Sequence, residues 1–248
     1  MNFFYPLNDP VQKTEGLFVY FPYDWKSLNN FSTNGLEKLL SDEENYIYIQ
    51  QLLDEKLNQI PDSKSFLNKI FEFLAKKPHL KEEEKFFLQK LVDFTDFYEE
   101  TEFRSLSQQS LRVNNVAFSY FLCLLARDPQ LKSELLQDTL DVAALLGNLE
   151  HAKALITLGA NVEVLSLLGK SPLAQSLLSQ NKDIFTGICE FLIERFGHAY
   201  FKNLIQGSVT DSKLTLLHIA AIYGKKEIVL YLLEHGVTVS AKSEDGAT

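Results

Sequence analysis

The sequence has little of the material from which disulfide frameworks, membrane spans and nucleic-acid sites are built. Its 248 residues include only two cysteines, Cys123 and Cys189, and both lie in apolar runs, which favours buried, reduced thiols. The longest apolar run, 116–126, is too short to span a bilayer. No basic block offsets the net charge of −9, so no nucleic-acid partner is expected. The first ten residues lack the pattern of a signal peptide, and we expect a cytoplasmic protein.

What is present is enough apolar material for well-packed cores. Hydrophobic residues make up 46% of the chain and charged residues 23%, which is typical of a soluble globular protein. The length allows one large domain or two smaller ones.

The second half of the chain repeats itself. Shifted back by 77 residues, 215–236 falls on 138–159, and a related segment lies between them. The units begin at residues that cap helix N-termini, spaced by 33, 44 and 33 residues: Asp138, Ser171, Thr215 and Thr248. Each cap is predicted to start a short helix, and glycines follow the helices where a left-handed turn is needed: Gly147, Gly159, Gly224 and Gly236.

This pattern resembles the ankyrin repeat, whose 33-residue period and Thr-Pro-Leu-His start match TLLHIAA at 215–221. The resemblance covers about 138–248. It implies that the His218 side chain bonds the backbone and the capping residue Thr215. The implied repeats are 138–170, 171–214 with an 11-residue insertion, and 215–247.

The last residues of the chain resemble the opening of a further repeat. Gly246 and Thr248 occupy the slots that Gly169 and Ser171 hold earlier in the sequence. Thr248 is therefore predicted to be the N-cap of a next repeat that is truncated there, as in a chain cut near a repeat boundary.

Residues 1–130 are predicted to form a helical domain of no recognised family, with a turn-rich arm at 1–35. Ser41 and Glu44 form a capping box, and apolar residues at helical spacing follow it. Further helices are expected at about 62–77, from 81 to 98 and at 108–126, and then a short helix leads into the repeats of 131–248. The helices of 108–136 are predicted to cover the first repeat, so the fold class is all-α, with a helical domain packed onto an ankyrin-repeat solenoid.

The ankyrin resemblance implies a protein-binding module. The two positions after each alanine pair line the concave groove in that family, and here they are apolar: Leu145, Leu146, Ile222 and Tyr223. We predict that these four residues, with Lys182 and Lys225, bind a partner protein. The competing hypothesis is that the extra residues at 181–187 and 198–206 fold over the apolar pairs.

An enzyme is the alternative hypothesis, with the repeats as a targeting element. A cysteine hydrolase would pair Cys123 with His79, or Cys189 with His151 or His198, and its chemistry would lie in residues 1–130 or in a missing C-terminal part. The acidic residues Asp93, Asp96 and Glu100 are predicted to form a solvated helix face. No catalytic residue, cofactor or metal site is predicted.

One further resemblance comes from composition and domain mix alone. Ankyrin repeats joined to an unfamiliar helical domain, in a chain rich in Lys, Asn, Leu and Phe, resemble effector proteins that intracellular bacteria inject into host cells. This style implies a bacterial effector that acts on a host protein in the host cytosol.

Overall fold

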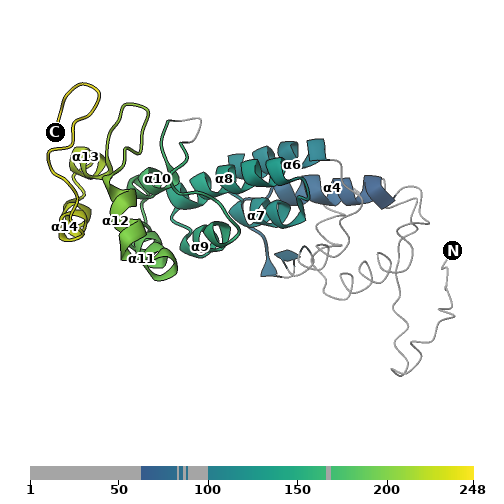
Figure 1. Ribbon diagram of the computed structural model, residues 1–248. Coiled ribbons are helices and arrows are strands. Elements are labelled where there is room, and N and C mark those ends of the chain that lie inside the picture. Colours follow the sequence, from purple (N-terminus) through teal and green to yellow (C-terminus); the bar gives the residue numbers. More distant parts are fainter. Residues whose placement is uncertain (1–62, 83, 86–87, 89–99, 166–168) are drawn as a thin grey trace, which may run out of the picture.

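The computed structural model describes residues 63–82, 84–85, 88, 100–165 and 169–248. Within these ranges the chain forms an elongated stack of helices (Figure 1). In chain order, with the labels of Figure 1, they are α4 (Ser63–Ala75), α6 (Glu100–Arg112), α7 (Val116–Leu125), α8 (Pro129–Leu146), α9 (Leu149–Thr157), α10 (Pro172–Leu178), α11 (Ile184–Phe196), α12 (His198–Gln206), α13 (Leu216–Ile222) and α14 (Lys226–Glu234).

The helices lie in two rows. One row runs through α6, α8, α10 and α13, each in contact with the next, and the other runs through α7, α9 and α11 (Figure 1). Paired helices join the rows, α8 with α9, α10 with α11 and α13 with α14. Because α6 and α7 pair in the same way, the helical domain packs onto the repeats and covers their first unit, and the predicted all-α fold class is confirmed.

The chain turns at 113–115, where a single helix over 108–126 was expected, so that prediction is wrong. Asn114 adopts a left-handed backbone with φ of 64°, which ends α6. Asn115 is then the N-cap of α7, and its Oδ1 accepts a hydrogen bond from Phe118 N at 3.1 Å. A break of this kind depends on the backbone conformation of one residue. The apolar residues on either side keep their helical spacing.

Helix α8 is longer than the sequence pattern predicts. Its N-cap is Asp128, whose Oδ1 accepts from Leu131 N at 2.7 Å, and Pro129 occupies the first turn. The helix continues without a break to Leu146, through the position of Asp138. The prediction of a separate short helix before the repeats, with Asp138 as a cap, is therefore wrong.

The helical domain and the repeats share a single hydrophobic core. Buried apolar side chains form a continuous cluster from Ile70 in α4 to Val237 beyond α14. At its N-terminal end Phe71 makes edge-to-face contacts with Phe118 and Phe121, with ring centroids 5.8 and 5.9 Å apart. Since this buried cluster runs through both parts without a break, we expect them to move together.

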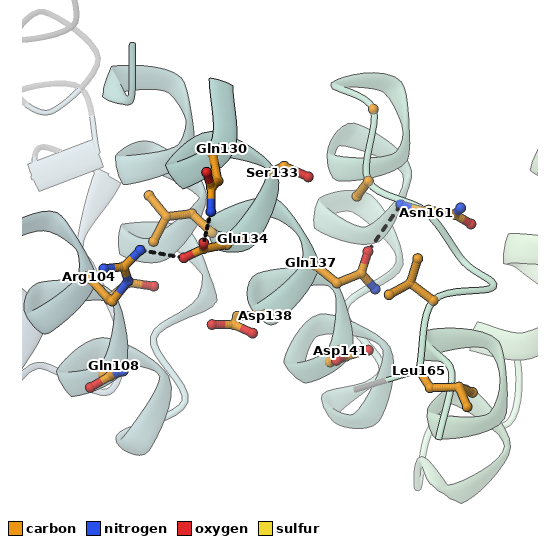
Figure 2. A pocket seen from close by; sticks show the side chains of 15 residues that line it. Arg104, Gln108, Gln130, Ser133, Glu134, Gln137, Asp138, Asp141, Asn161 and Leu165 are labelled. Atoms are coloured by element: carbon orange, nitrogen blue, oxygen red, sulfur yellow. Dashed lines mark hydrogen bonds and ion pairs between the residues drawn. The ribbon is translucent and has the colours of Figure 1, made fainter. Parts of the chain in front are cut away.

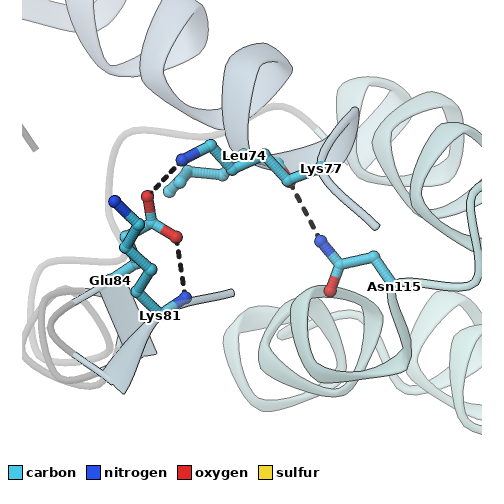
Figure 3. Close-up of polar contacts among 5 residues, drawn as sticks. All are labelled: Leu74, Lys77, Lys81, Glu84 and Asn115. Carbon is cyan, nitrogen blue, oxygen red and sulfur yellow. Dashed lines mark hydrogen bonds and ion pairs between the residues drawn. The ribbon is translucent and has the colours of Figure 1, made fainter. Parts of the chain in front are cut away.

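Buried polar contacts secure the joint after α4 (Figure 3). Asn115 Nδ2 donates to Leu74 O at 3.0 Å, which satisfies a carbonyl at the C-terminal end of α4. Glu84 is 1% exposed; its carboxylate accepts from Lys81 N at 2.9 Å and forms an ion pair with Lys77. A buried carboxylate is tolerated here because both of its oxygens have donors.

The first helix of the first repeat ends at a glycine that no other residue can replace. Gly147 is the left-handed C-cap of α8, with φ of 77°. A Cβ at Gly147 would lie 2.4 Å from Cβ of Asn181, so only glycine fits between the first and second repeats. Positive φ angles are also found at the other glycines that the repeat pattern marks, which are Gly159, Gly224 and Gly236.

The insertion in the second repeat forms an additional helix. Helix α12 packs on α11, and its last residue, Gln206, holds the loop after α14 with both side-chain atoms. Gln206 Nε2 donates to Gly236 O at 2.7 Å, and Gln206 Oε1 accepts from Thr238 N at 3.0 Å. The inserted helix thereby joins the second repeat to the third.

The loops between repeats lie side by side through backbone hydrogen bonds. Ser171 N donates to Val209 O at 3.0 Å, and Glu244 N donates to Ser212 O at 3.1 Å. Isolated antiparallel bridges accompany them, Lys170 with Thr210 and Ser208 with Thr215. The loops therefore form a third, thin layer along the row of first helices.

Several sequence predictions fall outside the described residues. These are the arm at 1–35 and the capping box of Ser41, and also Asp93 and Asp96. Within the described part of the chain, no helix is both long and apolar enough to cross a membrane.

We expect Asn115→Ala to lower the free energy of unfolding by about 2 to 4 kcal/mol, because it removes the N-cap of α7 and the donor to Leu74 O. Asn115→Ser keeps a capping oxygen but does not reach Leu74, and it should cost about half as much. Urea denaturation followed by circular dichroism measures both variants. Equal losses for the two would contradict the capping role.

Gln206→Ala should destabilise the protein by about 1 to 2 kcal/mol and speed amide hydrogen exchange at Val237 and Thr238, since both of its bonds to that loop are lost. Asn203→Ala, on the exposed side of the same helix, is the matched control and should change neither quantity. Unchanged exchange in the Gln206 variant would show that α12 does not hold the loop.

Candidate protein-interaction surface

Two pairs of apolar side chains stand exposed at the ends of first helices. Leu145 and Leu146 end α8 and are 40% and 41% exposed. Ile222 ends α13 and Tyr223 is its C-cap, and they are 65% and 52% exposed. A left-handed glycine turns the chain directly after each pair, so no further helical turn covers them.

The second repeat interrupts this apolar row. Helix α10 ends at Leu178, which is half-buried, and its C-cap Ser179 is buried. Asn181 follows, and its Nδ2 donates to Gly147 O of the first repeat at 2.9 Å. The surface between the two apolar pairs is therefore polar.

The inserted residues do not cover the apolar pairs, so the competing hypothesis from the sequence is wrong. Helix α12 lies against α11 and the loop after α14, and all four apolar side chains remain open to solvent. Lys182 is exposed in the loop before α11. Lys225 is half-buried at the N-cap position of α14.

An acidic stripe runs along α8 toward Leu145. Glu134, Asp138 and Asp141 follow one another at spacings of four and three residues, and Leu145 comes four residues later, so all four lie on one face of the helix. The three acidic residues line a cleft of about 780 Å³ between α8, α6 and the loop at 159–165 (Figure 2). The remaining lining residues are Arg104, Ser107, Gln108, Gln130, Ser133, Leu135, Gln137, Gly159, Ala160, Asn161, Val164 and Leu165.

The charges in this cleft are unevenly compensated (Figure 2). Arg104 forms an ion pair with Glu134 and lowers the pKa of that carboxyl group. Burial raises the pKa of Asp138, and the neighbouring Glu134 raises it further against the opposing effect of Arg104. Burial, together with the charge of Asp138, raises the pKa of Asp141 to about 7.

Two enclosed polar atoms beside the stripe have no hydrogen-bond partner in the described part of the chain. They are Asp141 Oδ1 and Gln137 Nε2. The other amide atom of Gln137, Oε1, accepts from Asn161 N at 3.3 Å, which ties α8 to the loop. An enclosed polar atom without a partner costs free energy, so the cleft is not arranged for stability alone.

In the third repeat, the residues that correspond to Asp138 and Asp141 have hydrogen-bond partners. Thr215 caps α13, the ring Nδ1 of His218 lies 3.1 Å from Thr215 N, and its Nε2 lies 3.2 Å from Ala247 O. The corresponding residues of the first repeat are Asp138 and Asp141, and Asp138 has no free helix N–H groups to cap because α8 begins at Pro129, directly after its cap Asp128. The second repeat begins with Ser171, whose hydroxyl accepts from Ala174 N.

Sequence reasoning missed this acidic cleft. The spacing of Glu134, Asp138 and Asp141 is visible in the sequence, but the assignment of Asp138 as a cap placed Glu134 in a separate short helix. That helix does open at Asp128 and Pro129, but its continuation through Asp138 to Leu146 was not predicted.

The cysteines are placed where thiolate chemistry is disfavoured. Both are fully buried, and burial raises the pKa of Cys123 to about 12 and that of Cys189 well above its ordinary value. Cys123 Sγ contacts Thr139 Oγ1, not a histidine. In the described residues no group of three or more potential metal-binding side chains gathers.

Comparison with known proteins supports the repeat assignment. Residues 140–243 match the family model of ankyrin repeats in three copies. This segment is an ankyrin-repeat solenoid. The chain is also similar to the transient receptor potential cation channel subfamily A member 1 homolog of Caenorhabditis elegans, with 31% identity over 118 residues, which are 48% of this chain. The chain spans only 9% of the length of that relative.

The raised pKa of Asp141 makes stability depend on pH. The folded protein holds a proton on this carboxyl group up to about pH 7, whereas the ordinary value is 3.8, so its contribution to stability is lost as pH rises between these values. Asp141→Asn imitates the protonated group. Because solvent partly screens the charge, we expect it to raise the free energy of unfolding by about 1 to 2 kcal/mol above neutral pH.

Near pH 4 the same variant should leave the free energy of unfolding unchanged. Urea denaturation at both pH values measures the effect, with Glu194→Gln on the exposed side of α11 as a control of equal charge change. A gain of equal size at both pH values would contradict the assignment.

Proposed function

We propose that the protein binds a partner protein along the face made by the first helices α8, α10 and α13 and the adjacent loops. Ankyrin repeats indicate a protein–protein interaction module, and the repeats span 140–243. The observation that supports this particular face is the exposure of Leu145, Leu146, Ile222 and Tyr223, which we assign as apolar anchors. Lys182 and Lys225 provide positive charge beside them.

The scaffold is suited to this role because it is stiff. The continuous core from Ile70 to Val237 and the Gln206 bonds between repeats hold the anchors in fixed relative positions. A preorganised surface loses little conformational entropy on binding, so a larger share of the contact energy appears as affinity. Large apolar side chains that stand exposed on a rigid frame typically mark interaction sites.

The other hypotheses from the sequence have less support. The burial of Cys123 and Cys189 opposes a cysteine hydrolase built on either thiol. The bacterial effector role and the cytosolic location rest on composition and on the absence of a signal-peptide pattern, and both stay predictions of the sequence. The channel activity in the name of the similar nematode protein is a property of a protein about ten times longer than the matched segment, and we do not transfer it.

The test is affinity capture with tagged protein from cell lysate, read by quantitative mass spectrometry. Leu146→Glu and Tyr223→Glu each place a charge on the proposed face and should reduce capture of the true partner at least about tenfold. Leu230→Glu is the matched control, since Leu230 is 50% exposed on the second helix α14, away from the row of first helices. If both groove variants retain every protein that the wild type captures, this face is not the binding site.

A further inference from the structure

We propose that the cleft between α6, α8 and the loop at 159–165 receives a cationic side chain of the bound partner, held by Asp138 and Asp141. The inference rests on the proposed function and specifies the chemistry of the partner. It predicts a partner segment in which an arginine or a lysine lies next to an apolar residue.

The charges that line the cleft favour a cationic ligand. Arg104 is the one cation among the described residues that line the cleft, and Glu134 already occupies it. Apart from Arg104, no opposite charge in the lining faces Asp138 and Asp141, which lie three residues apart on one helix face. A guanidinium or ammonium group placed between them would interact with both carboxylates at once.

Two residues of the cleft lining, Gln137 and Asp141, each have one enclosed polar atom without a partner among the described residues. Asp141 Oδ1 is a hydrogen-bond acceptor and Gln137 Nε2 is a donor. Both residues are only half-buried, and a small rotation of their side chains toward a bound peptide would let Asp141 accept from a cationic side chain and Gln137 donate to a backbone carbonyl. A small cation would satisfy only the first atom.

The wall of the cleft opposite α8 is partly apolar. Val164 and Leu165 are exposed large apolar side chains on the loop, and they border the cleft across from the acidic stripe. Arginine and lysine carry an aliphatic stem below the charge, and such stems pack on apolar surface while the charged head is paired. The planar fork of arginine matches a carboxylate better than lysine does, so arginine is the favoured residue.

The acidic stripe that lines the cleft leads along α8 to the apolar anchor Leu145. Asp141 and Leu145 lie about one helical turn apart on the same face of α8, a separation of about 6 Å along the axis. A partner segment with its cation at Asp141 would place a neighbouring apolar side chain at Leu145. The third repeat lacks this feature because His218 there is bonded to Thr215 and lies near Ala247 O.

The test uses the full chain and a defined probe, acetyl-Leu-Arg-Ala-Leu-amide, titrated at about pH 8, which is above the pKa of about 7 at Asp141. Amide chemical shifts in two-dimensional NMR report the binding site. We expect shifts concentrated at 134–141 and 159–165, and at least about fivefold weaker binding when citrulline, an uncharged isostere, replaces the arginine.

Matched variants separate a specific site from general attraction to an acidic protein. Asp138→Asn and Asp141→Asn should each weaken arginine-peptide binding at least about fivefold, whereas Glu194→Gln should leave it unchanged. Thermal melts check that every variant is folded, and asparagine is close in size to aspartate. Equal binding of the citrulline peptide, shifts outside the cleft, or full affinity in the double asparagine variant would each overturn the inference.

The outcomes distinguish this inference from the proposed function. If the arginine peptide shifts the cleft residues while Leu146→Glu and Tyr223→Glu leave partner capture intact, the apolar face fails and the cation site stands. If capture depends on the apolar face but the peptide result is negative, the proposed function stands and the cation site is wrong.

Discussion

The structure depends above all on the place where α8 begins. Asp128 caps the helix and Pro129 opens it, so α8 runs through the expected start of the first repeat and ends at Leu146. It contacts α6 and α7 on one side and α9 and α10 on the other. One helix thus belongs to both the helical domain and the repeats, and the stiffness of the whole stack follows from this sharing. The same continuity exposes Asp138 as a surface carboxylate with nothing to cap.

The cleft contains charged and polar groups that lower the stability of the fold. At the joint after α4 the buried polar groups are paired, because the Glu84 carboxylate and the Asn115 amide both have partners (Figure 3). In the cleft, Asp138 and Asp141 repel each other, and Asp141 Oδ1 has no partner among the described residues. Uncompensated groups of this kind gather more often at functional sites than in purely structural regions, which is the physical reason to look for a ligand there.

Much of the repeat architecture was accessible from local chemistry. The caps Ser171 and Thr215, the glycines after the helices and the alanine pairs each act on neighbours within a few residues, so their spacing predicted the helix pairs of 138–248. The break at Asn114 was missed because it depends on one residue within an unbroken apolar periodicity. The continuation of α8 through Asp138 was missed because aspartate at that position also fits a helix cap. The insertion was located in the sequence, but its helical form and its contacts through Gln206 were not predicted.

The sequence by itself determined the all-α class, the period of the repeats and which side chains follow each alanine pair, because these are properties of residues close together along the chain. Only the tertiary structure decided that Leu145, Leu146, Ile222 and Tyr223 remain uncovered, and that α12 packs away from them. It also decided that Arg104 forms its ion pair with Glu134, and that Asp138 and Asp141 lie close enough for their charges to repel. Exposure and electrostatic pairing depend on atoms that lie far apart in the sequence, and the packing of α6, α8 and the loop at 159–165 brings those atoms together.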